Sequence, residues 1–268
     1  MWVRFLSASF IATFLAAGCS KAEQCKGNPN ALGTSRVIQV DPSKQKRVGT
    51  DQYPETLPLE DHEVVLTFDD GPLPPYTSNV LDILKSECVK ATFFTVGSMA
   101  QYQPQILKRE HDEGHTIGTH TQHHPHIPRL SFARAKKDID DGIASAAEVL
   151  GGENLVAPFF RFPYLEQTSA TENYAISRGL MIWSVDLYAN DWTRITPDQV
   201  MELALKRLEK KGRGILLLHD IQARTAAALP EFLHELKRRG YRVVHVVPAP
   251  PSEQELEAKQ GVAYKPER

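Results

Sequence analysis

Strand-like and helix-like segments alternate through the middle of this chain, and this alternation limits the folds open to it. The strand-length apolar segments are Val64–Phe68, Ala91–Val96, Thr116–Gly118, Phe159–Arg161, Leu180–Val185, Gly214–His219 and Arg242–Val247. The amphipathic segments between them include Ser131–Leu150, Pro197–Lys211 and Ala226–Arg239. Strands that alternate with helices pair in parallel. The sequence therefore predicts an α/β fold built on a parallel sheet.

The first of these strands ends in two adjacent carboxylates. Asp69 and Asp70 follow Val64–Phe68 directly, and Gly71-Pro72 then stops the strand. Burying a charge is costly unless it is paired or holds a metal, and α/β enzymes bind ligands at the C-terminal ends of their strands. Because successive strand residues point to opposite faces, we expect one aspartate to hold a metal and the other to handle protons. The alternative is a pair of solvated turn residues, since Asp-Gly and Gly-Pro are ordinary turn signals.

Histidines follow the strand at Thr116–Gly118. If the backbone turns helical there, His120 and His124 lie one turn apart on the same face, as two imidazoles do in zinc-binding helices. His123 is a second possible partner for His120, at a spacing of three residues. A histidine-rich surface turn is the remaining alternative.

Five short motifs in a fixed order give the chain a family resemblance. They are Thr67–Pro72, His120–Pro125, Arg161–Tyr164, Asp186–Trp192 and Leu216–His219. In this order they resemble the motifs of the polysaccharide deacetylases of carbohydrate esterase family four, the NodB-homology domain. The resemblance covers about residues 61–247. It implies a distorted, incomplete (β/α) barrel of about seven parallel strands, with every motif at a strand end or in the following loop.

The resemblance also implies a metal-dependent hydrolase. Asp70, His120 and His124 match the family's metal ligands, so one divalent ion is expected. The two-histidine, one-aspartate set suits zinc, and cobalt or nickel would fit as well. Asp69 matches the general base that takes a proton from water, and Arg161 matches the residue that pairs with that base.

The remaining roles follow from the same resemblance. His219 matches the general acid that protonates the leaving amine, and Asp191 matches the aspartate that orients this histidine. The backbone N–H of Tyr164 would help to stabilise the oxyanion. Trp192 and Leu217 would form the wall of a pocket for the acetyl methyl group, or else pack as ordinary core residues.

The fourth motif departs from the family pattern. The family usually places its two aspartates three residues apart, whereas Leu187–Asn190 separates Asp186 from Asp191 here. Asp191 keeps its Trp192 neighbour, so we expect its carboxylate within roughly 2.6–3.2 Å of the His219 ring. Asp186 is expected to hold the loop or the nearby barrel mouth.

The implied activity is removal of N-acetyl groups from N-acetylglucosamine-containing polysaccharide, either peptidoglycan or a chitin-like oligosaccharide. An O-acetyl esterase acting on xylan-like sugars is an alternative that uses the same metal and base. A carbohydrate-binding lipoprotein that has lost catalysis is a second alternative, although it should lack at least one of the motif residues. The formal net charge of −2 does not suggest nucleic acid as a partner.

The N-terminus resembles an export signal. Residues 1–18 carry a basic Arg4 and a short apolar stretch, too short and too polar for a membrane span. Cys19 follows Leu15–Gly18 as in a bacterial lipobox, which predicts lipidation at Cys19 and a membrane anchor facing the periplasm or the exterior. A plain secretory signal is the alternative.

The segments that flank the main domain carry fewer signals. Residues 19–60 read as a tether with an edge strand at Val37–Val40, and residues 248–268 as a loose tail. Cys25 and Cys88 could form a disulfide in an oxidising compartment. We favour an ordinary buried thiol for Cys88.

Overall fold

The computed structural model describes residue 25 and residues 27–250. The predicted signal segment at residues 1–18, the predicted lipidation site Cys19 and residues 251–268 of the tail predicted at 248–268 lie outside them. The strands are β1 (Thr34–Val40), β2 (Arg47–Val48), β3 (Glu63–Asp69), β4 (Thr92–Thr95), β5 (Thr116–Thr119), β6 (Phe159–Phe160), β7 (Met181–Trp183), β8 (Leu187–Tyr188), β9 (Gly214–His219) and β10 (Arg242–Pro248). The helices are α1 (Tyr76–Ser86), α2 (Gly97–Tyr102), α3 (Pro104–Asp112), α4 (Phe132–Leu150), α5 (Ser169–Ser177), α6 (Pro197–Lys211) and α7 (Ala223–Arg238). Short 3-10 turns are η1 (Ile127–Arg129), η2 (Glu153–Leu155) and η3 (Pro163–Leu165).

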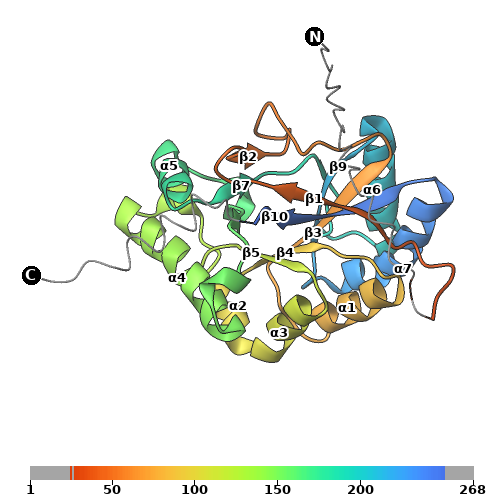
Figure 1. The fold of residues 1–268 in the computed structure, drawn as a ribbon, viewed down its shortest axis with the longest axis horizontal. Coiled ribbons are helices and arrows are strands. Elements are labelled where there is room, and N and C mark those ends of the chain that lie inside the picture. The colour runs from red at the N-terminus through yellow and green to blue at the C-terminus, as the bar shows by residue number, and fades with distance from the viewer. Residues whose placement is uncertain (1–24, 26, 251–268) are drawn as a thin grey trace, which may run out of the picture.

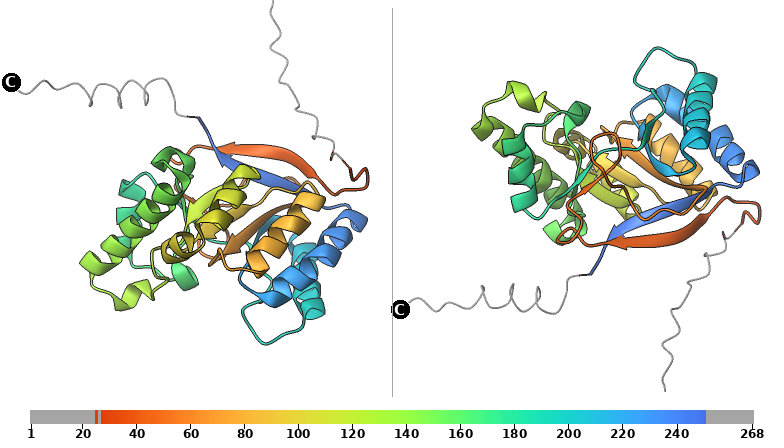
Figure 2. Two further views of the ribbon diagram at one scale, coloured as in Figure 1. Left: turned by 90° about the horizontal axis from the view of Figure 1, so that it is seen from below. Right: turned by 90° about the horizontal axis from the view of Figure 1, so that it is seen from above.

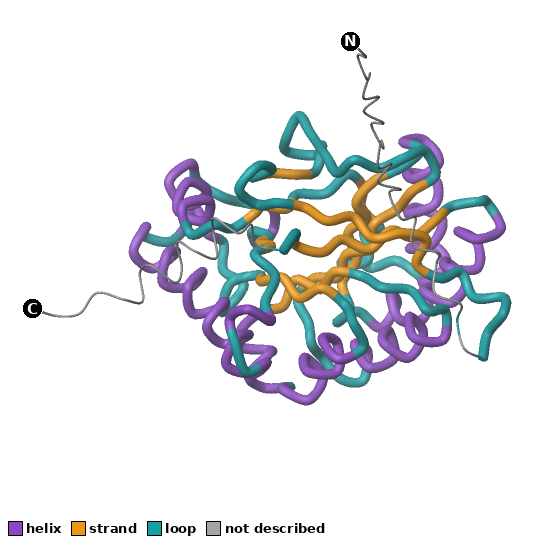
Figure 3. The backbone as a smooth tube through the Cα atoms, viewed as in Figure 1, coloured by secondary structure: helices purple, strands orange, loops and turns teal. Residues whose placement is uncertain are grey.

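The strands form one parallel sheet with helices outside it (Figure 1). Its order is β1-β10-β3-β4-β5-β6-β7-β2, and β9 joins β3 to β8. Every recorded strand pair is parallel, as predicted. The tube view shows the strands at the centre and the helices around them (Figure 3). Within the described residues β7 and β8 are not paired, so the sheet is an incomplete barrel.

The sheet has ten strands rather than the expected seven or so. Two of the additional strands, β2 and β8, contain two residues each and carry no alternating pattern that a sequence could display. β1 is longer than the expected edge strand and pairs with β10. The two strands run side by side along one edge of the molecule (Figure 2).

Strand β3 is buried along its whole length, and its side chains alternate between two cores. Val64, Leu66 and Phe68 pack against the helix layer, whereas Val65 packs inside the barrel with Phe94. By the same alternation Thr67 and Asp69 face the barrel interior. The polar end of β3 therefore opens at the mouth of the barrel.

Local signals set the helix ends. Thr196 Oγ1 accepts a hydrogen bond from Gln199 N, and Gln199 Oε1 accepts one from Thr196 N, which makes a capping box. Pro197 occupies the first helical position, where its missing N–H is not needed. The predicted start and end of α6 are confirmed. No helix in the described part of the chain is long and apolar enough to span a membrane.

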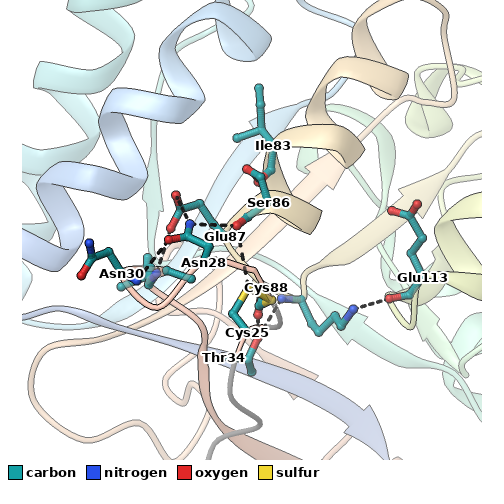
Figure 4. Close-up of a disulfide and its surroundings, with 12 residues drawn as sticks. Cys25, Asn28, Asn30, Thr34, Ile83, Ser86, Glu87, Cys88 and Glu113 are labelled. Atoms are coloured by element: carbon teal, nitrogen blue, oxygen red, sulfur yellow. Dashed lines mark hydrogen bonds between the residues drawn. A yellow bond between two sulfur atoms is a disulfide. The ribbon is translucent and has the colours of Figure 1, made fainter.

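A disulfide joins Cys25 to Cys88, so the expectation of an ordinary buried thiol at Cys88 was wrong. The segment after Cys25 is held against the end of α1 by a hydrogen bond from Asn28 Nδ2 to Ser86 O at 3.1 Å (Figure 4). Leu32 N also donates to Glu87 Oε2 at 2.8 Å. These contacts bring together cysteines that lie 63 residues apart in the sequence. The two cysteines can form a disulfide only because these long-range contacts bring them together, and no local sequence pattern indicates such contacts.

Candidate active site

The predicted site residues meet at the carboxyl ends of neighbouring strands. Asp69 ends β3 and His219 ends β9, and the two are cross-strand partners. Asp69 also pairs with Phe94 of β4, whereas β5 and β6 lead into His120 and Arg161. Because the strands are parallel, these side chains share one edge of the barrel.

The two adjacent aspartates do not point to opposite faces, contrary to the expectation from strand alternation. Asp70 has a φ of 79°, in the left-handed region, so the alternation stops after Asp69. Asp69 Oδ2 lies 3.8 Å and Asp70 Oδ1 lies 3.5 Å from the same atom, His120 Nε2. The backbone turn, rather than the strand, brings both carboxylates to one site.

The expected helical turn after β5 is also absent. Residues 120–126 are irregular, and Thr121 and His124 have φ values of 66° and 54°. The rings of His120 and His124 nevertheless come together, with centroids 4.9 Å apart. His123 points elsewhere, because its side chain is 65% exposed and its Nδ1 lies 2.8 Å from Asp138. Of the two partners considered for His120, the structure brings His124 into the site.

Asp70, His120 and His124 form a donor set that fits a divalent metal. One ligand atom from each lies within 4.8 Å of the others. Asp70 Oδ1 is buried and lies 3.1 Å from His124 Nε2, yet it accepts no hydrogen bond from any residue that the structure describes. His120 Nδ1 donates to Arg161 O at 2.7 Å, which leaves the Nε2 lone pair facing Asp70. An imidazole held by its second nitrogen is the usual arrangement of a metal-ligating histidine.

The charge states of this cluster also suit a metal. Burial lowers the pKa of His120 and favours the neutral imidazole. Burial raises the pKa of Asp70, but the contact with His124 and the charge of His219 outweigh it and hold the pKa well below its ordinary range. Metal ligands must be deprotonated. Both shifts favour the forms that bind a cation.

Arg161 and Asp69 form a buried ion pair beside this cluster. Arg161 Nη1 donates to Asp69 Oδ1 at 2.6 Å and to Thr67 Oγ1 at 2.9 Å. The guanidinium is fully buried, lies 4.2 Å from the centre of the Phe94 ring, and donates through Nη2 to Ser184 O at 3.2 Å. A buried ion pair is tolerated when its remaining donors are satisfied. Asp69 Oδ1 is thereby fixed, and Oδ2 is left facing the cluster.

On the other side of the cluster, His219 is held by Asp191. Nδ1 of His219 donates to Asp191 Oδ1 at 2.8 Å, within the range expected from the sequence. Asp191 Oδ2 accepts from His219 N at 2.6 Å and from Thr225 Oγ1 at 2.5 Å. Burial lowers the pKa of His219, but the Asp191 hydrogen bond and the charges of Asp191, Asp70 and Asp69 outweigh it and raise that pKa to about 9. His219 Nε2 lies 4.0 Å from Asp70 Oδ2, so this nitrogen faces the cluster.

Asp186 lies away from the imidazole. Its carboxylate accepts hydrogen bonds from Thr50 Oγ1 and Thr56 Oγ1, both at 2.6 Å, and from Ile215 N at 2.9 Å. These contacts join the segment before β3 to the start of β9. The longer loop after Asp186 includes β8, which pairs with β9. This pairing keeps the chain beside β9, so that Asp191 reaches the His219 ring.

The three remaining predicted residues lie around the cluster. Trp192 is 46% exposed, and its ring centre lies 5.5 Å from that of His219. Leu217 is buried, two residues before His219 on the same face of β9. Tyr164 has a φ of 59°, is 54% exposed, and has its ring centre 4.6 Å from that of His124.

Sequence reasoning missed two supporting residues. Thr225, in the first turn of α7, donates to Asp191. Asp220 accepts from Gly71 N at 3.2 Å and from the Thr77 hydroxyl, and a Cβ on Gly71 would lie 2.0 Å from Asp220 Oδ2. Only glycine therefore fits at the turn after Asp70. The only sequence signal for Asp220 was its place beside His219, and Thr225 had none.

Comparison with known proteins identifies the same family as the motifs. A sequence model described as polysaccharide deacetylase matches residues 57–183. The peptidoglycan-N-acetylglucosamine deacetylase of Bacillus cereus is 35% identical over 195 residues, which cover 71% of this chain and 89% of that protein. The peptidoglycan-N-acetylmuramic acid deacetylase PdaA of Bacillus subtilis is 29% identical over 239 residues, covering 86% of this chain and 89% of that protein.

A solved structure resembles the fold as well. The peptidoglycan deacetylase of Bdellovibrio bacteriovorus superposes with a TM-score of 0.74 at 34% sequence identity. The match covers 83% of this chain and 62% of that one. The parallel sheet and its surrounding helices are thus an arrangement already seen in a deacetylase.

Proposed function

Since this chain belongs to the polysaccharide deacetylase family, whose members are metal-dependent hydrolases, we propose that it removes N-acetyl groups from N-acetylglucosamine-containing peptidoglycan. One observation supports this proposal most. Asp69 Oδ2 and His219 Nε2 face the Asp70, His120 and His124 cluster, each with its second polar atom held by a buried partner. A base and an acid beside a metal-ligand set are what amide hydrolysis requires. The names of the relatives support peptidoglycan as the substrate class.

Asp69 is the proposed general base. Its Oδ1 is occupied by Arg161, and its Oδ2 is 3.8 Å from His120 Nε2. Oδ2 is therefore the atom placed to take a proton from an attacking water molecule. Arg161 fixes the direction of this atom, since its own position is set by four buried hydrogen-bond acceptors: Asp69, Thr67, Trp183 and Ser184.

His219 is the proposed general acid. The hydrogen bond from Nδ1 to Asp191 leaves Nε2 to carry the proton that goes to the leaving nitrogen. The pKa of about 9 keeps the imidazole protonated at neutral pH. Asp191 orients this ring and stabilises its charge, as carboxylates do for imidazoles.

The other predicted roles concern the substrate. The amide N–H of Tyr164 would stabilise the oxyanion, and Trp192 with Leu217 would line a pocket for the acetyl methyl group. Asp70, His120 and His124 would hold the divalent ion, for which zinc is our first choice and cobalt or nickel would fit. When bound, the ion would lower the pKa of water and polarise the carbonyl.

The alternatives differ in substrate and are separable in one assay. Acetate release is compared on peptidoglycan, chitooligosaccharide and acetylated xylan. We expect release from peptidoglycan or chitooligosaccharide. Release only from acetylated xylan would support the O-acetyl esterase, and binding without any acetate release would support a non-catalytic carbohydrate-binding protein.

Replacing the partner of His219 should change the pH dependence of the reaction. Asp191→Asn removes a negative charge from the imidazolium, which lowers the pKa of His219 and moves the basic limb of the pH–rate profile about 1–3 units lower. The profile of kcat/KM is measured beside Asp186→Asn, which alters the other candidate carboxylate and should leave this limb in place. A shift in Asp186→Asn alone would reverse the two assignments.

The protein is also proposed to be an exported lipoprotein anchored through Cys19. The Cys25–Cys88 disulfide supports export, because disulfides persist in oxidising compartments. The domain proposed for residues 61–247 would then work in the cell envelope, carried by the tether at residues 19–60, with residues 248–268 as a tail.

Removing the proposed lipid attachment site should release the protein from membranes. Cys19→Ser is expected to turn a membrane-sedimenting protein into a soluble exported one or an unprocessed precursor, because stable anchoring depends on acyl chains at that cysteine. The measurement is fractionation followed by mass analysis of the N-terminus. A wild-type protein found entirely soluble outside the cytoplasm would support a plain secretory signal instead.

A further inference from the structure

The loop that carries both histidine ligands adopts a backbone that its residues do not favour. Thr121 and His124 both have positive φ values, 66° and 54°. For a β-branched residue such as Thr121 this region is a marked outlier. Such conformations persist only where the surrounding structure fixes them. The loop between His120 and His124 therefore needs support from outside itself.

Helix α4 supplies much of that support through one carboxylate. Asp138 Oδ1 accepts from Gln122 N and from His123 N, both at 3.0 Å, and Oδ2 lies 2.8 Å from His123 Nδ1. The backbone carbonyl of Asp138 also accepts from Gln122 N, at 2.9 Å. The middle of the loop is thus held by a single residue of a long helix.

The fit between the helix and the loop is close. A Cβ on Gly142, one turn after Asp138, would lie 2.5 Å from the carbonyl carbon of Thr121. On the other side, Gly97 N of α2 donates to Thr121 O at 2.9 Å and Ser98 N donates to Gln122 O at 3.0 Å. The loop is clamped between two helices, and Asp138 is the charged group in this clamp.

We propose that Asp138 is a positioning residue for the metal site, acting through the loop at residues 120–124, and that His123 belongs to this support and not to the ligand set. The inference rests on the proposed function, since it presumes that His120 and His124 bind the metal. With Asp138 in place, the two Nε2 atoms lie 3.5 Å and 3.1 Å from Asp70 Oδ1. Without it, Gln122 and His123 lose their side-chain acceptor, and the strained loop can relax away from this arrangement.

The test measures zinc affinity rather than turnover. Metal-free full-length protein is titrated with zinc against a competing chelator. In Asp138→Ala the dissociation constant should rise about 10-fold, the lower end of the loss caused by removing a direct hydrogen-bond partner of a metal ligand, because Asp138 acts on the ligands only through the loop. Asp138→Asn keeps an oxygen that can accept from both backbone amides, so its affinity should stay within about 3-fold of the wild type, a modest loss by comparison with full removal.

Two controls separate positioning from other effects. Asp141→Ala, on the same helix, removes only an exposed pair with Lys137 and should leave zinc affinity unchanged. His123→Ala keeps both backbone hydrogen bonds to Asp138 and should cost far less affinity than His124→Ala.

Melting temperatures of the metal-free variants check that each is folded. If Asp138→Ala does not fold, Asp138→Ser is tested instead, because a serine side chain is too short to accept hydrogen bonds from both Gln122 and His123.

Three outcomes bear on the claim. Wild-type zinc affinity in a folded Asp138→Ala or Asp138→Ser variant would overturn it. An equal loss of zinc in His123→Ala and His124→Ala would also overturn it, because His123 would then be a ligand. If the wild-type protein binds neither zinc nor cobalt nor nickel, the proposed metal-dependent function is contradicted, and this outcome is measured on the wild-type protein alone.

Discussion

Protein treated with a strong chelator is expected to lose its deacetylase activity and to regain it when zinc or cobalt is added. The reason is the donor set of Asp70, His120 and His124, whose atoms lie within 4.8 Å of one another around an aspartate oxygen without a hydrogen-bond donor among the described residues. A metal ion contributes several kcal/mol to stabilising developing charge. The residual rate should therefore be below about 1% of the starting rate, since each 1.4 kcal/mol is a factor of ten.

The control for this experiment is chelator already saturated with zinc, which should leave the activity intact. Elemental analysis establishes the metal content of each sample. Full activity in protein shown to contain no metal would contradict the proposed mechanism.

Replacing each of the two neighbouring aspartates by asparagine should have different effects on turnover and on zinc affinity. Asp69→Asn removes the proposed base, so turnover should fall about 10²–10⁴-fold while zinc is retained. Asp70→Asn removes a proposed ligand, so zinc affinity should fall together with turnover. Both quantities are measured on the same preparations, by acetate release and by zinc titration.

The Asp69→Asn variant needs a stability control. It leaves the buried Arg161 guanidinium without its charged partner, and breaking a buried pair is destabilising. Its melting temperature should be recorded, and activity compared well below it. Equal loss of zinc in the two variants would show that their roles are wrongly assigned.

The strands that are buried on both faces could be predicted from the sequence. β9 has the predicted ends, Gly214 and His219, and β3 extends one residue beyond the prediction on each side. In both strands a continuous apolar run meets a polar residue at the barrel mouth. The two-residue strands β2 and β8 have no such run, and they form because neighbouring strands present open edges to them.

The local geometry of the site could not be predicted in the same way. Helical spacing suggested that His120 and His124 share a face, but their rings converge through left-handed residues in an irregular loop. Strand alternation predicted that Asp69 and Asp70 point to opposite faces, whereas the positive φ of Asp70 places both carboxylates at the same site. Both conformations are stabilised by distant residues, Asp138 in one case and Asp220, which packs on Gly71, in the other. A local pattern carries no information about such contacts.

The most direct test of the proposed function counts two products of one reaction. Zinc-loaded protein is incubated with peptidoglycan whose glucosamine is fully N-acetylated, and acetate and free amino groups are both measured. We predict that the two appear in equal amounts and that both are formed at least about 100-fold more slowly with Asp69→Asn. Acetate released without new amino groups would contradict N-deacetylation and identify the bond cleaved as an ester.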